Sequence, residues 1–156
     1  MTNFIPYMER TRNYYRAQGF ERDYVWAQHD DTPFFALTKP LEDCRMTLVV
    51  TAVAHPEIPK PIRKAETIPF AEAPAAFDTD GLAWDRETTH TNDRRSYFPM
   101  EQLTLLAKGG LIGSLTSDFH FVPTEYSQRA TIEEDAPQIA AACVADQVDI
   151  ALLVPL

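Results

Sequence analysis

Residues with acid–base and anion-binding chemistry gather in segment 88–95, which reads TTHTNDRR. His90 supplies an imidazole, Asp93 a carboxylate and Arg94 a guanidinium within a few residues. A histidine near an acid can hold a proton, and arginines can bind a carboxylate. The segment therefore favours acid–base chemistry or anion binding. A solvated polar loop in which Asp93 caps the following helix explains the same residues.

A second group of polar residues lies in segment 117–121, SDFHF. If this segment is extended, alternation turns His120 away from Phe119 and Phe121 and places it beside Asp118 on one face. That pairing predicts a second acid–base site. The alternative is a hydrogen-bonded structural histidine, as buried polar groups commonly are.

The other reactive residues give weaker signals. His55 directly follows an apolar run, at the strand end where active-site loops gather, but the adjoining Pro56 equally suggests a turn. Cys44 and Cys143 lie about 100 residues apart and form no CxxC or CxxxH pair, so no metal site is predicted. No glycine-rich nucleotide motif, GxSxG or HExxH is present.

An α/β scaffold is predicted to carry these residues. Segment 46–54, MTLVVTAVA, is a continuous apolar run and predicts a central strand buried on both faces. Further strands are expected at 66–70 (an edge strand), 84–91, 111–117 and 148–156 (a buried strand), helices at 8–18, 98–110 and 131–146, and a loop at 118–127. Thr131 and Glu134 have capping-box spacing. This order predicts a mostly parallel open sheet with flanking helices, incomplete at its C-terminal side.

Length and charge narrow the class of protein. A chain of 156 residues with 45% hydrophobic content fits one domain overall, with a helix and extended arm at 1–44 and the α/β part at 45–156. The net charge of −9 argues against nucleic acid or an anionic membrane as partner. Without an apolar run long enough for a membrane span or signal peptide, a soluble cytoplasmic protein is expected.

Four blocks of sequence, in order from about residue 45 to the end, resemble the selenoprotein B family of glycine, sarcosine, betaine and D-proline reductases. They are TLVVTAVAH, THTNDRRSYFPMEQLTLLAKGGLIGSL, SDFHFVP and TIEEDAPQIAAACVADQVDIALLVPL. The last block resembles the helix and strand that lead, in the family, into a selenocysteine or cysteine. No further cofactor is implied.

The resemblance implies an oxidoreductase that cleaves a small amine or amino-acid-type substrate. A selenolate or thiolate attacks the substrate, and a thiol protein re-reduces the product. His90 and His120 match family histidines, which implies catalytic roles in substrate positioning and proton delivery. With Asp93 only approximately in register, we expect Asp93, Arg94, Asp118 and His55 to bind substrate.

In the family, the redox residue is expected just after Leu156, so the isolated chain is expected to be inactive. Three explanations stay open: a UGA codon read as a stop, a short subunit completed by a second polypeptide, or a repurposed binding protein. An exposed strand edge at 148–154 is expected to support homo-oligomers.

Two other functions remain open on the sequence. The chain could be a non-catalytic subunit that binds a small anion at the His90 loop or completes a partner. It could also be a lyase or isomerase in which His90 and His120 form an acid–base pair, which needs no missing residue.

Overall fold

The computed structural model describes residues 6–23, 25, 27–33, 35–55, 64–80, 82, 86–124 and 127–156. The chain forms two compact units, Met1–Phe34 and Phe35–Leu156. The first unit contains helix α1 (Tyr7–Ala17), which confirms the helix predicted at 8–18. Gly19 follows it with a φ of +88°, a conformation that favours glycine after a helix.

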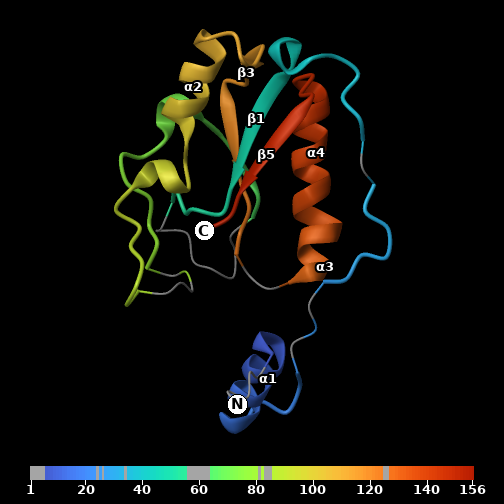
Figure 1. Ribbon diagram of the computed structural model, residues 1–156, viewed down its shortest axis with the longest axis vertical. Coiled ribbons are helices and arrows are strands. Elements are labelled where there is room, and N and C mark those ends of the chain that lie inside the picture. The colour runs from blue at the N-terminus through green and yellow to red at the C-terminus, as the bar shows by residue number, and fades with distance from the viewer. Residues whose placement is uncertain are drawn as a thin grey trace, which may run out of the picture. The chain divides into compact units, whose positions relative to one another are not determined.

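The second unit is built on a mostly parallel mixed sheet, which confirms the predicted α/β class (Figure 1). In the described residues its five strands are β1 (Arg45–Val50), β2 (Glu66–Pro69), β3 (Ser114–Leu115), β4 (Asp118–Phe121) and β5 (Ile150–Val154). Strand β1 is central, because β3 and β4 pair with it in parallel on one side and β5 on the other. Strand β2 is the antiparallel edge strand beside β4.

Helices α2 (Met100–Lys108), α3 (Gln128–Ala130) and α4 (Ala136–Ala145) accompany the sheet, with a π-helical turn, η5 (Thr131–Asp135), joining the last two. Short 3₁₀ turns lie at η1 (Leu41–Asp43), η3 (Phe70–Glu72) and η4 (Arg94–Ser96). Helix α2 confirms the predicted second helix, and Gly110, with a φ of +72°, leads the chain away from it. No helix in the described part of the chain has the length and apolar content to cross a membrane.

The two faces of the sheet differ in chemistry because side chains alternate along each strand. Leu48 of β1 and Phe119 of β4 point into the main apolar core, which also contains Leu103 of α2. On the opposite face, Val49 is paired in register with His120 of β4. Helix α4 covers this second face, so α2 and α4 lie on opposite sides of the sheet (Figure 1).

An aromatic cluster fills the core on the α2 side. The rings of Phe98 and Phe119 lie 4.9 Å apart, and Phe77 lies 4.8 Å from Phe98. Phe98 and Phe119 are both almost completely buried. These contacts anchor β4 from one side and leave its other side chains to face α4.

Three predictions about local structure are wrong. Segment 118–127 was expected to be a loop, but its first part is β4. This strand pairs with β1 on one side and with β2 on the other, and its side chains alternate between the two faces of the sheet. The strand expected at 84–91 is a turn at 86–88 and irregular backbone at 89–91 in its described part. The strand at 148–156 was expected to be buried, but β5 pairs only with β1 in the described sheet, and Leu153 is 69% exposed.

The start of the last helical stretch also differs from the prediction. The Ser127 side chain accepts a hydrogen bond from the Ala130 amide (3.2 Å), so the helix begins before the Thr131–Glu134 capping box. The turn from Thr131 to Asp135 is π-helical. Pro137 follows within the first turn of α4 and has no amide proton to continue the α-helical ladder.

Candidate functional site

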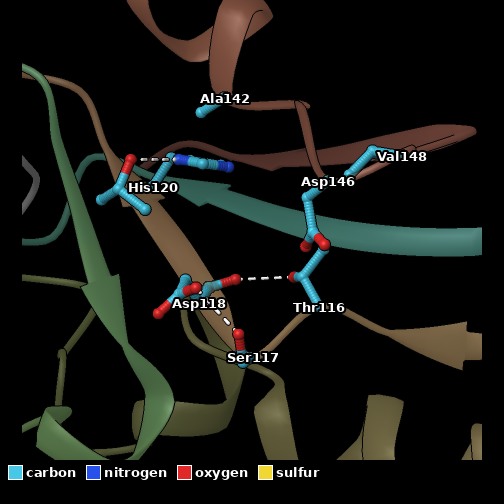
Figure 2. A pocket seen from close by; sticks show the side chains of 8 residues that line it. Thr116, Ser117, Asp118, His120, Ala142, Asp146 and Val148 are labelled. Carbon is cyan, nitrogen blue, oxygen red and sulfur yellow. Dashed lines mark hydrogen bonds between the residues drawn. The ribbon is translucent and has the colours of Figure 1, made fainter. Parts of the chain in front are cut away.

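A small pocket opens between the second face of the sheet and the C-terminal end of α4 (Figure 2). Its volume is about 120 Å³. It is lined by Thr67, Thr116, Ser117, Asp118, His120, Ala142, Asp146 and Val148. Asp118 and His120, which the sequence places on one face of a strand, therefore share this pocket.

His120 is held at both ring nitrogens. It is 4% exposed, and its Nδ1 lies 3.0 Å from the Thr67 hydroxyl, its cross-strand neighbour on β2. Its Nε2 lies 3.9 Å from Sγ of Cys143 on α4. Burial lowers the pKa of His120, and the nearby Asp118 and Asp146 only partly oppose this. The imidazole is therefore neutral near neutral pH and can accept a proton.

Two carboxylates form the acidic wall of the pocket. The Ser117 hydroxyl donates to Asp118 Oδ2 (2.8 Å), and the Thr116 hydroxyl donates to the Asp118 carbonyl (2.6 Å). Arg45 forms an ion pair with Asp146, donating from Nη2 to both carboxylate oxygens at 2.7 and 2.8 Å. Asp118 forms no ion pair among the described residues, so its negative charge stays available to a ligand.

The pocket lies beside the break between β3 and β4, where Thr116 and Ser117 separate the two strands. Asp146 and Val148 come from the turn between α4 and β5. The site is thus at the amino ends of β4 and β5, away from the carboxyl ends that usually bind ligands in open α/β sheets.

The other predicted site residues do not line this pocket. His90 is exposed. Asp93 accepts a hydrogen bond from the Arg95 amide (3.1 Å) and caps the 3₁₀ turn η4. The alternative interpretation expected it to cap the following helix, but the N-cap of α2 is Pro99. His55 Nε2 lies 3.8 Å from Oε2 of Glu66.

Arg94 is held by contacts within the fold. Its Nη1 donates to the Pro74 carbonyl (2.7 Å), it pairs with Glu101, and its guanidinium lies 5.3 Å from the centre of the Phe98 ring. The polar loop thus fastens the start of α2 to the core, and it is separate from the His120 pocket.

Sequence reasoning missed Thr67, Cys143 and Asp146. Thr67 meets His120 only through the antiparallel register of β2 and β4, which the sequence does not specify. Cys143 and Asp146 had a usable signal, because they are three residues apart at the end of a helix and so lie on one face. Asp146 is the only charged residue in IAAACVAD, from 139 to 146.

In the described residues, no three His, Cys, Asp or Glu side chains are arranged to hold a metal ion. Comparison of the chain with protein-family models, with curated proteins and with solved structures gave no match. The functional argument therefore starts from the geometry of the His120 pocket.

Proposed function

We propose that the chain binds a small amine in the His120 pocket and provides the substrate-binding part of a reductase resembling the selenoprotein B family. The observation that supports this most directly is that one pocket is lined by two complementary groups. They are the carboxylate of Asp118, which has no ion-pair partner among the described residues, and the neutral imidazole of His120. The class of reaction is inferred from the sequence resemblance, and the kind of ligand is inferred from the residues that line the pocket.

The size and charge of the pocket favour a small cation. Its volume of about 120 Å³ is well below the roughly 300–1,000 Å³ of sites for drug-sized ligands, so it admits a molecule of only a few heavy atoms. The Asp118 carboxylate can accept a charge-assisted hydrogen bond from an ammonium group. The hydroxyls of Thr67 and Ser117 add further hydrogen-bonding groups.

His120 gives the pocket a hydrogen-bond acceptor. The neutral imidazole can accept a hydrogen bond from the bound ammonium at Nε2, which holds the nitrogen in its protonated form, the form that leaves when the carbon–nitrogen bond breaks. By the family resemblance, a selenolate or thiolate would attack the substrate carbon and form a new bond to it, while the nitrogen leaves as the amine with the electron pair of the carbon–nitrogen bond. Within this proposal the described residues bind the amine, orient it and keep it protonated.

Isothermal titration calorimetry with glycine, ethylamine and propionate tests the proposal. We expect the two amines to bind and propionate, which lacks an ammonium group, not to bind. Asp118→Asn should weaken amine binding by about ten- to hundredfold, because a charge-assisted hydrogen bond contributes roughly 1.5–3 kcal/mol. The matched control is Asp80→Asn, since the Asp80 side chain is 92% exposed and lies outside the pocket. No amine binding, or equal affinities for the two variants, would refute it.

The two other functions have less support from the geometry. A lyase or isomerase that uses His90 with His120 needs both imidazoles at one site, and His90 does not line the pocket. An anion-binding loop at His90 needs an available Arg94, but Arg94 is held by Pro74 and Glu101.

We also propose that a second copy of the chain pairs with the edge of β5. In the described sheet β5 bonds only to β1, and Leu153 is 69% exposed on the α4 side. An unpaired apolar edge strand is a template for another strand. Sedimentation analysis should show a dimer that Leu153→Lys converts to a monomer. A wild-type monomer would refute this proposal without affecting the amine site.

A further inference from the structure

Cys143 places its sulfur next to the imidazole of the pocket. Its Sγ lies 3.9 Å from His120 Nε2, and the other ring nitrogen lies 3.0 Å from the Thr67 hydroxyl. The three side chains form a hydroxyl–imidazole–thiol chain across β2, β4 and α4. In nucleophilic catalysis a base contacts the nucleophile and a third group orients the base. Here the imidazole is the base, the thiol is the nucleophile and the hydroxyl orients the imidazole.

The two cysteines of the chain differ in accessibility. Cys143 is half-buried, and its Sγ lies 3.9 Å from Nε2 of His120, a residue that lines the pocket. Cys44 is completely buried, and its thiol lies 3.3 Å from the Pro40 carbonyl. Cys44 therefore serves as an internal control for reactions of the folded chain.

We propose that Cys143 is a thiol-exchange site that reacts with small cationic disulfides, with His120 as its general base. This goes beyond the proposed amine site, with which it shares the pocket, the base His120 and the carboxylate of Asp118. The cationic preference follows from Asp118, the uncompensated carboxylate of the pocket.

The exchange balances without another reactant. Cys143 Sγ attacks one sulfur of the disulfide R–S–S–R, and His120 Nε2 accepts the thiol proton. The R–S⁻ group leaves with the electron pair of the broken sulfur–sulfur bond and takes up that proton. The products are a Cys143–S–S–R mixed disulfide and R–SH, and a second thiol reverses the reaction.

Base assistance matters at this position because the thiol is not ionised in advance. Burial raises the pKa of Cys143, and the negative charge of Asp146 adds to this effect. A thiol in this state needs a proton acceptor in contact with it to react near neutral pH. The neutral imidazole of His120 fills that role.

The test is reaction of the full chain with cystamine, a dicationic disulfide, followed by intact-mass spectrometry and peptide mapping. We expect one adduct, on Cys143, and none on Cys44 until the chain is denatured. Dithiodiglycolate, a dianionic disulfide of similar size, should react more slowly. Cys143→Ser should give no adduct in the folded state.

Two variants test the role of the base. His120→Gln should slow the cystamine reaction by at least about tenfold, less than the roughly 10²–10⁴-fold typical of a positioned base, because the 3.9 Å contact is long. Thr67→Val keeps the imidazole but removes its hydroxyl partner, and should slow the reaction by a smaller factor. Thr67 is an exposed residue on an edge strand, so its substitution should leave the fold intact. If His120→Gln does not fold, the rate of Thr67→Val tests whether the imidazole acts as the base.

Absence of a Cys143 adduct, or an unchanged rate in the folded variants, would overturn the proposal. The amine titrations depend on Asp118, whereas adduct formation depends on Cys143 and His120 and uses Asp118 only for its preference for cationic disulfides. Amine binding can therefore fail while thiol exchange holds, and the reverse. The two results are therefore distinguishable.

Discussion

Arg45 is the residue whose removal tests most directly how the pocket is built. Its side chain donates to the Asp146 carboxylate at 2.7 and 2.8 Å, to the Asp146 carbonyl at 2.9 Å and to the Leu115 carbonyl at 3.2 Å. It thereby joins the start of β1 to β3 and to the end of α4. Arg45→Met removes all these bonds but keeps an apolar stem of similar length.

The expected loss follows from the exposure of the partners. The Arg45 side chain is 31% exposed and that of Asp146 is 44% exposed. An ion pair in such a partly solvated place contributes about 0.2–1 kcal/mol. The bonds to the two carbonyls add about 1 kcal/mol each once discounted for solvent. Arg45→Met should therefore lower the free energy of unfolding by about 2–3 kcal/mol, a large part of the roughly 5–15 kcal/mol typical of a domain.

Urea denaturation followed by far-ultraviolet circular dichroism measures this loss. The matched control is Arg16→Met, which breaks an ion pair with Asp23 inside the other unit and should leave the main transition unchanged. A double-mutant cycle with Asp146→Asn isolates the pairwise term, expected to be about 1 kcal/mol or less. If Arg45→Met shifts the midpoint no more than Arg16→Met does, Arg45 does not hold the pocket together and this reasoning fails.

Three further predictions concern the core, the sheet and the imidazole. Phe119→Ala should cost about 3–5 kcal/mol in urea titrations, as for other fully buried phenylalanines, and Phe119→Leu clearly less. Gly113→Ala should lower stability by about 1–3 kcal/mol, because its new methyl group would lie 2.7 Å from the Asp43 carbonyl carbon; a thermal midpoint equal to wild type would contradict this. Because His120 titrates below its usual 6.5 in the fold, the unfolded chain binds a proton first as pH falls. Stability should drop below about pH 6.5, by at most about 1.4 kcal/mol per unit of pKa depression, and this drop should be absent in His120→Gln.

The sequence predicted the elements that local pattern specifies. The apolar run of β1 and the glycine stop of α2 are both readable in single segments. β4 was missed as a strand because Asp118 and the nearby Pro123 resemble a loop, although its alternation was recognised. The start of the last helix depends on which of two polar residues caps it, and Ser127 prevails over Thr131 in the structure.

Some residues of the pocket could be predicted from local sequence pattern, and others could not. Asp118 and His120 share a strand, so alternation alone puts them on one face. Thr67 and Asp146 come from other elements, and only the register of β2 and the turn after α4 bring them to His120. The His90 loop has a composition that suits solvent exposure as well as chemistry, and its placement outside the pocket depends on tertiary packing.

Both proposals use Nε2 of His120 as an acceptor. In these proposals an amine bound at Asp118 donates a hydrogen bond to Nε2, and Cys143 gives up its proton to the same nitrogen. One nitrogen cannot accept both, so a bound amine should slow the reaction of Cys143 with cystamine. If saturating glycine leaves the cystamine rate unchanged while amine binding and thiol exchange both occur, the amine and the thiol do not share the imidazole, and the acceptor in one of the two proposals has to be another group.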